Sequence, residues 1–169
     1  MGMITKEFYQ KCIEIEVYKS KKRLLRRVHS ESARAILFLR KMQFYSGFRS
    51  AWYRRKLAIT YGIFVHRETQ IGLGLKLPHP DGIIIGKGVH IGDNVTIFQQ
   101  VTIGSAHTGD WENGVQPVLG SNVTLFAGAK ILGDIKVADG TTVGANAVLN
   151  KTTEQNTVWA GVPARCLHE

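Results

Sequence analysis

Histidine is the residue type best suited to proton transfer near neutral pH, and one histidine of this sequence stands in an unusual setting. His79 lies between Pro78 and Pro80, and Asp81 follows two positions later. An imidazole with a pKa near neutrality can take the proton from a hydroxyl group while that hydroxyl attacks an electrophile. Asp81 could orient such an imidazole, or it could only shape the turn. A solvated turn residue is the alternative for His79 itself.

The other histidines and the cysteines give weaker signals. His107 lies in a glycine-containing segment, where it could assist catalysis, contact an acceptor or simply be exposed. No two histidines are five positions apart, and Cys12 and Cys166 stand near opposite ends of the chain, so we expect no metal site. No serine or cysteine lies in a nucleophile-elbow sequence, which favours direct group transfer over a covalent enzyme intermediate.

A six-residue repeat dominates the chain after about residue 71 and must position these groups. Counting in sixes places Ile, Leu or Val at Ile85, Ile91, Ile97 and Ile103, and again at Leu119, Leu125, Ile131, Val137, Val143 and Leu149. Three positions after most of these come residues that tolerate positive φ, as at Gly88, Asn94, Asn122, Gly128, Asp134, Gly140 and Asn146. An inward aliphatic side chain and a tight corner in every hexad predict a triangular coil of short, stacked parallel strands.

Two interruptions break the repeat. After Ile103 the next inward aliphatic is due at position 109 but stands at Leu119, so the intervening chain bulges out in a loop over 105–117. Ile71 and Leu77 predict an inward residue at position 83, yet the later register starts at Ile85, and His79 lies within this slip of two positions. Long excursions and local irregularities in a regular scaffold are common places for function.

Residues 1–62 form a basic region with helical spacing of apolar residues. Phe8, Cys12 and Ile15 follow this spacing, as do Leu24, Val28, Ala35, Leu39 and Met42. Residues 1–67 carry a net charge of +12 (16 Lys/Arg, four Asp/Glu) and residues 68–169 carry −3, which sum to the +9 of the chain. No apolar run approaches about 18 residues, so we expect a cytoplasmic protein without a membrane span.

The charge asymmetry suggests that the N-terminal region meets something anionic. Aromatic residues interleaved with Arg and Lys suit a peripheral contact with an anionic inner membrane face, at Phe44, Tyr45, Phe48, Trp52 and Tyr53. A helical cap that docks subunits is the alternative. The sequence holds no nucleic-acid reader motif, so we expect no nucleic-acid partner.

Several segments together resemble the serine acetyltransferase-type branch of the hexapeptide-repeat acyltransferases. They are LPHPDGIIIG, VTIG before the loop, AGAKILGDI and AGVPAR, and the resemblance covers about residues 64–167. It implies a mainly β fold: a left-handed parallel β-helix over 63–169, a handedness that parallel crossovers otherwise avoid. It also implies a homotrimer, or a hexamer built through the N-terminal helices, with acetyl-CoA between neighbouring protomers and His79 as the base.

The glycine-rich and alanine-rich coils and the nearby cations are the candidates for binding acetyl-CoA. Small side chains let a pantetheine arm approach backbone amides, and one N–H could steady the developing oxyanion, while cations could reach the phosphates. The candidates are Gly128, Ala129, Lys130, Gly144, Ala145, Lys151 and Arg165. For each small residue, packing at a β-helix corner is the alternative.

The sequence departs from the serine acetyltransferases at charged positions. Phe64 and Pro78 stand where that family has aspartates, and the loop segment that holds serine there reads Val115-Gln116-Pro117. A site without partners for an ammonium and a carboxylate should bind serine poorly. We therefore expect a saccharide hydroxyl of capsule, exopolysaccharide or lipopolysaccharide assembly as the acceptor, with His107, Trp111 and Gln116 as candidate contacts. Serine O-acetylation for cysteine biosynthesis and a non-catalytic trimeric scaffold are the alternatives.

Overall fold

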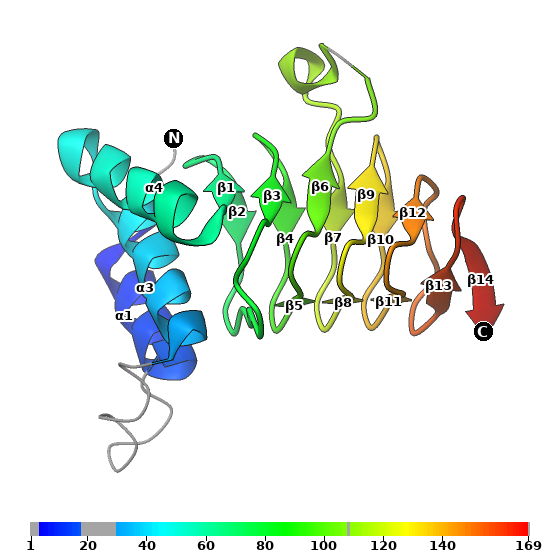
Figure 1. Cartoon of the computed structure of the whole chain (residues 1–169), viewed down its shortest axis with the longest axis horizontal. Coiled ribbons are helices and arrows are strands. Elements are labelled where there is room, and N and C mark those ends of the chain that lie inside the picture. Colours follow the sequence, from blue (N-terminus) through cyan, green and yellow to red (C-terminus); the bar gives the residue numbers. More distant parts are fainter. Residues whose placement is uncertain (1–3, 18–29, 108, 169) are drawn as a thin grey trace.

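The computed structural model describes residues 4–17, 30–107 and 109–168, and it shows a helical region followed by a parallel β-helix (Figure 1). The β-helix has three sheets, one along each side of the coil. The first sheet contains β1 (Phe64–Val65), β3 (Ile84–Ile85), β6 (Thr102–Gly104), β9 (Lys130–Leu132) and β12 (Val148–Leu149). The second contains β2 (Gln70–Ile71), β4 (His90–Ile91), β7 (Val118–Leu119) and β10 (Lys136–Val137). The third contains β5 (Thr96–Ile97), β8 (Thr124–Leu125), β11 (Thr142–Val143), β13 (Val158–Ala160) and the antiparallel β14 (Arg165–His168).

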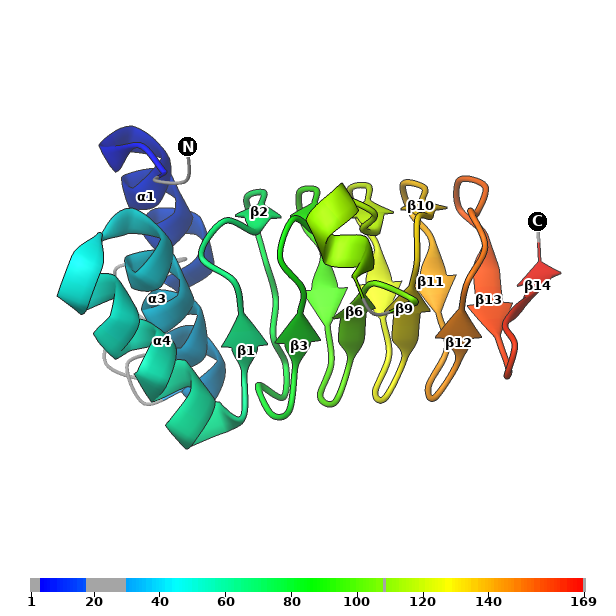
Figure 2. The same ribbon diagram turned by 90° about the horizontal axis from the view of Figure 1, so that it is seen from above.

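Strand register confirms the repeat and both of its interruptions. Ile84 pairs with Thr102, three hexads later, which is one regular coil. Phe64 pairs with Ile84, two positions more than three hexads later, so the first coil carries the slip. Thr102 pairs with Lys130, ten positions more than three hexads later, so the second interruption projects from the coil as a loop (Figures 1 and 2).

The inward aliphatic positions form one continuous core. All ten hexad positions from Ile85 to Leu149 are buried, none more than 4% exposed. The predicted corners adopt positive φ at Asn94, Asn122 and Asn146, and also at Gln100. The expectation for Asp134 is wrong: Gly133, one position earlier, takes positive φ (96°), because glycine reaches this region without a Cβ clash.

Among residues 4–17 and 30–61, three helices and a π-helical turn cover the start of the β-helix (Figure 2). They are α1 (Lys6–Cys12), η1 (Ile13–Val17), α3 (Glu31–Phe44) and α4 (Gly47–Tyr61), and the predicted positions Leu24 and Val28 lie outside the described residues. Gly62 ends α4 in the left-handed conformation. Burial raises the pKa of Tyr61, near the same end, to about 12, and the hydrogen bond that its hydroxyl donates to Glu31 adds to the rise.

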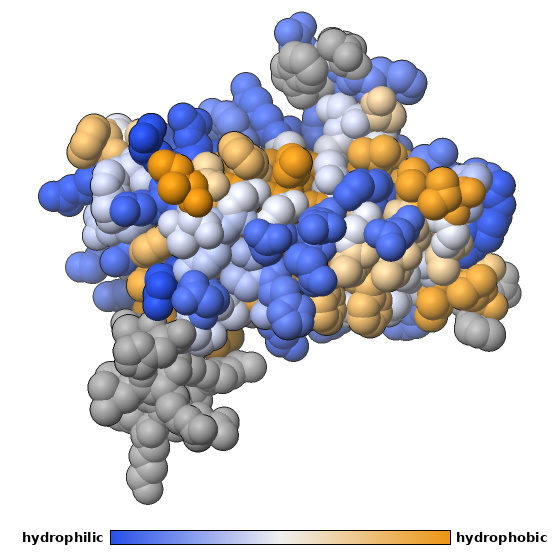
Figure 3. Space-filling model, in the orientation of Figure 1, coloured by the Kyte–Doolittle hydropathy of each residue, from blue (hydrophilic) through white to orange (hydrophobic). Residues whose placement is uncertain are grey.

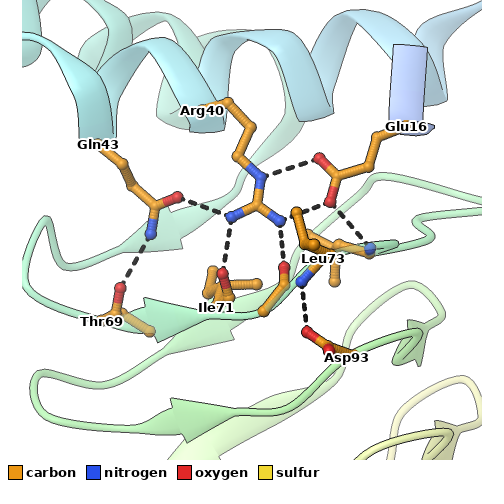
Figure 4. Close-up of polar contacts among 9 residues, drawn as sticks. Glu16, Arg40, Gln43, Thr69, Ile71, Leu73 and Asp93 are labelled. Atoms are coloured by element: carbon orange, nitrogen blue, oxygen red, sulfur yellow. Dashed lines mark hydrogen bonds and ion pairs between the residues drawn. The ribbon is translucent and has the colours of Figure 1, made fainter. Parts of the chain in front are cut away.

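A buried ion pair attaches these helices to the first coil (Figure 4). Arg40 on α3 contacts Glu16 on η1 at 2.6 Å, and both side chains are fully buried. The same guanidinium donates to the backbone carbonyls of Ile71 and Gly72, and Glu16 accepts the N–H of Leu75. These backbone groups would be orphaned without the ion pair, because no earlier strand of the described chain lies at this end of the coil to satisfy them.

Candidate functional site

His79 lies at the corner where the third sheet passes to the first, in the coil that carries the slip of two positions. Its side chain is exposed. The amide of Asp81 donates to the His79 carbonyl at 2.9 Å, and the Asp81 carbonyl in turn accepts from the amide of Gln100 on the next coil at 2.8 Å. The expanded turn is therefore held by its backbone, which leaves the imidazole presented outward.

An aromatic row continues from His79 along this corner. The Phe98 ring lies 6.1 Å from the His79 ring, centroid to centroid, at an interplanar angle of 44°. Phe126 on the following coil stacks on Phe98 at 5.1 Å and 14°. Phe98 was not singled out from the sequence, although the repeat places it and Phe126 at equivalent positions, each directly after an inward aliphatic residue.

The same corner then changes from aromatic to small side chains. Gly144 occupies the position of Phe126 one coil later, and Ala145 beside it is exposed. Ala129 is fully buried, so its side chain packs in the core and only its backbone could meet a ligand. Gly128 has φ of 74°, and a Cβ there would clash with the Asn146 side chain, so the corner itself requires this glycine.

The three cationic candidates are spread over two corners. Lys130 donates from its ammonium to the carbonyl of Gln100 at 2.7 Å, which holds it beside the His79 corner. Arg165 is exposed on β14 and donates to the Ala164 carbonyl. Lys151 is exposed after β12, at the corner between the first and second sheets.

The loop over 105–117 also leaves the coil at that second corner, between β6 and β7 (Figure 1). It contains a short 3-10 helix, η3 (Asp110–Asn113). His107 is highly exposed, with its Nδ1 3.4 Å from an Asp110 carboxylate oxygen. Gln116 is buried and donates from its amide to the Ser105 hydroxyl, so it closes the base of the loop. The side chain of Trp111 lies outside what the structure describes.

His79 and the loop therefore occupy the two opposite edges of the first sheet, and one protomer does not bring them together. A groove of about 850 Å³ lies at the loop edge, between α1 and the corner that carries Lys87, and Glu112 of the loop also lines it. It is remote from His79 within the protomer. Among the described residues, no group of three or more His, Cys, Asp or Glu could hold a metal ion.

Comparison with known proteins places this geometry in a family. The model of the bacterial transferase hexapeptide (six repeats) matches residues 116–151. The serine acetyltransferase of Buchnera aphidicola subsp. Schizaphis graminum is 37% identical over 118 residues, which cover 70% of this chain and 45% of that protein. The chain belongs to the hexapeptide-repeat transferases. The serine acetyltransferase of Staphylococcus epidermidis is 39% identical over 108 residues, covering 64% of this chain and half of that protein.

Solved structures support the same assignment and settle the handedness of the coil. Serine acetyltransferase from Brucella abortus strain S19 superposes with a TM-score of 0.77 at 27% identity, covering 96% of this hexapeptide-repeat chain and 68% of that one. The soybean serine acetyltransferase apoenzyme gives a TM-score of 0.80 at 24% identity, covering 96% and 70%, a likeness of fold alone. The expected left-handed β-helix is confirmed.

The expected saccharide acceptor is wrong. The relatives that this hexapeptide-repeat transferase matches are serine acetyltransferases, so they support the alternative acceptor instead. The chain spans about half the length of these curated relatives. The expectation had rested on charged groups missing at Phe64, at Pro78 and in the loop segment Val115-Gln116-Pro117, but the absence of such groups does not select a sugar. Among the described residues no helix is long and apolar enough to cross a membrane.

Proposed function

We propose that this chain is a serine O-acetyltransferase that uses acetyl-CoA, with His79 as the general base. The observation that carries the proposal is an exposed imidazole at the expanded corner of the first coil, beside a row of apolar and then small residues, in a chain 37–39% identical to serine acetyltransferases. Two solved relatives are named as complexes, one with CoA and one with serine. The activity belongs in the cytoplasm, where acetyl-CoA is available.

His79 accepts the proton of the serine hydroxyl as its oxygen attacks the thioester carbonyl. A base near neutral pKa is needed, because a neutral hydroxyl is a poor nucleophile. The new O–C bond forms a tetrahedral oxyanion, which a hydrogen-bond donor close to His79 must steady. When the C–S bond breaks, the imidazolium of His79 returns its proton to the leaving thiolate, giving free CoA and O-acetylserine.

Asp81 supplies the negative charge nearest in sequence to the imidazole, and we assign it the stabilisation of the imidazolium. This role compensates for Phe64 and Pro78, which carry no charge. We assign to Phe98, whose ring centre lies 6.1 Å from that of His79, the restriction of the rotation of the imidazole. Both are positioning residues.

A homotrimer would unite the two edges of the first sheet. If that sheet faces the threefold axis, the His79 corner of each protomer meets the loop corner of its neighbour. Exposed apolar side chains on β1 and β3 suit such a contact: Phe64 is 57% exposed and Ile84 45%, and Figure 3 shows apolar surface over these strands. His107 and Lys151 of one protomer would then face the acceptor and the CoA phosphates beside His79 of another. Lys130 and Arg165 would act from the His79 side.

The test is release of free thiol from acetyl-CoA in the presence of serine. Wild-type protein should release CoA with serine, and His79→Ala should lose turnover while it keeps its oligomeric mass and its affinity for CoA. His90→Ala is the matched control, because His90 is also exposed but lies on the second sheet. Undiminished activity of His79→Ala would remove His79 from the mechanism. Binding of acetyl-CoA with no thiol release would instead indicate a scaffold protein.

Peripheral contact with an anionic membrane is a separate proposal, since it depends on α4 and on none of the residues around His79.

A further inference from the structure

A compact patch of aromatic and basic side chains is exposed at the start of α4. A hollow of about 420 Å³ is lined by Tyr45, Phe48, Arg49, Trp52 and Tyr53, which we call the α4 patch. Phe48 is 84% exposed and Trp52 is 43% exposed. They are four positions apart on one helix face, so both rings project from the same side. Large apolar side chains gathered in this way on a surface indicate a contact with another body.

The rings of the α4 patch carry cations directly above them. The Arg49 guanidinium lies 5.4 Å from the Tyr45 ring centre, and the Lys56 ammonium lies 5.2 Å from that of Trp52. Lys41 on α3 lies 5.3 Å from the Tyr53 ring. Arg and Lys held against rings keep their charged groups at the level of the aromatic surface, where both can meet one partner.

Nearby acidic residues do not balance this charge. The sequence holds no Asp or Glu from residue 32 to residue 67, while the same stretch holds eight Arg and Lys. The eight are Arg34, Arg40, Lys41, Arg49, Arg54, Arg55, Lys56 and Arg67. Within the described part of the chain, Arg40 alone among them enters a buried ion pair, the one with Glu16. Arg34 is paired with Glu31, whereas no ion pair of the described residues engages the cations on and beside the α4 patch, which are Lys41, Arg49, Arg54, Arg55 and Lys56. The α4 patch therefore lies in a positive field.

We propose that the α4 patch docks on the surface of an anionic lipid bilayer. A second copy of this chain would bring a positive patch against another positive patch, which like-charge repulsion opposes. A nucleic acid would meet the cations but would gain little from the exposed Phe48 side chain. A bilayer surface suits both components, since rings of Trp, Tyr and Phe settle at the headgroup level and Arg and Lys meet lipid phosphates. Helix α4 would lie in the interface plane and would not cross the bilayer.

The test uses the full-length chain and flotation with vesicles of phosphatidylcholine alone or with about 30% phosphatidylglycerol. Wild-type protein should float with the anionic vesicles at low salt, should not float with the neutral ones, and should bind more weakly at about 0.5 M salt because ionic screening shortens the reach of the charges. Each cation removed from the α4 patch or from its rings, as in Arg49→Gln or Lys56→Gln, should weaken binding about fivefold. Phe48→Ser/Trp52→Ser should weaken it at least about tenfold, and its residual binding should be abolished by salt.

Matched controls lie at the far end of the β-helix. Val162 is 72% exposed and Lys136 is exposed on β10, so Val162→Ser and Lys136→Gln remove comparable groups outside the patch and should bind like wild type. Equal binding to neutral vesicles, absence of binding at low salt, or wild-type binding by the patch variants would overturn the proposal. The proposal would also fail if the wild-type protein did not bind vesicles and Phe48→Ser/Trp52→Ser lowered the mass of the assembly. A second copy of the chain would then be the occupant of the α4 patch. None of these readouts depends on serine acetylation.

Discussion

Replacing Arg40 with methionine should destabilise the protein strongly, because Arg40 is the partner of a fully buried carboxylate. The variant leaves Glu16 charged and buried, and it removes the donors to the carbonyls of Ile71 and Gly72. Loss of one partner from a buried ion pair costs about 3–5 kcal/mol. For a chain of this length that corresponds to a fall in Tm of about 6–20 °C.

Chemical and thermal unfolding at one fixed protein concentration would measure the loss, since the apparent stability of an oligomer depends on concentration. Arg34→Met is the matched control, because Arg34 pairs with Glu31 on the same helix at 3.4 Å but both side chains are substantially exposed. It should cost no more than about 1 kcal/mol. Adding Glu16→Gln to Arg40→Met should restore about 1–3 kcal/mol, because the orphaned charge is neutralised. A loss below about 1 kcal/mol in Arg40→Met, or a further loss on adding Glu16→Gln, would refute the reasoning.

Four further predictions concern the site, the thiols and the corners. Phe98→Leu should lower kcat while it changes the KM for acetyl-CoA less, and it should change the pH profile of kcat. The reason is that the imidazole of His79, whose ring centre lies 6.1 Å from that of Phe98, would be freer to rotate. A kcat equal to that of wild type with an unchanged pH profile would exclude a positioning role for Phe98. A thiol reagent at neutral pH should modify the exposed Cys166 and spare Cys12, because the Cys12 side chain is fully buried and burial raises the pKa of its thiol from 9.0 to about 11. Mass spectrometry of the labelled protein would measure this, and rapid labelling of Cys12 would contradict it. Because the folded pKa of Cys12 is raised, its contribution to stability is complete below pH 9 and is lost as the pH rises through 11, so unfolding midpoints should fall across that window and fall less in Cys12→Ala. Gly120→Ala should lower Tm by several degrees, since the new Cβ would clash with an Asp139 carboxylate oxygen. In the control Gly104→Ala the new Cβ meets nothing within 4 Å, so its Tm should match that of wild type. Similar Tm values for the two variants would show that the corner at Gly120 relaxes.

The β-helix could be read from the sequence because each hexad repeats the same local requirement. An aliphatic residue points inward and a residue tolerant of positive φ turns the corner, so the slip at His79 and the loop over 105–117 both follow from counting. The shift from Asp134 to Gly133 shows the limit of that count, since a glycine one position away can take the turn instead.

Contacts between distant residues could not be read in the same way. Arg40 and Glu16 are 24 positions apart and meet only because η1 and α3 pack on the first coil. Gln116 looked like an acceptor contact because it lies in the loop, yet its side chain is turned inward to Ser105. The neighbourhood of His79 was found by its irregular spacing, whereas its aromatic neighbour Phe98 required the stacking of coils that only the structure displays.

The way both ends of the β-helix are closed has a consequence for self-assembly. A stack of parallel coils is in principle endless, since each end presents unpaired strand edges that can template another chain. Helices fixed by Arg40 cover one end, and at the other end β14 turns back antiparallel to β13, so the third sheet does not end in a strand of the parallel stack. Both features should oppose the end-to-end association of chains, and loosening either one should favour end-to-end polymers over a discrete assembly.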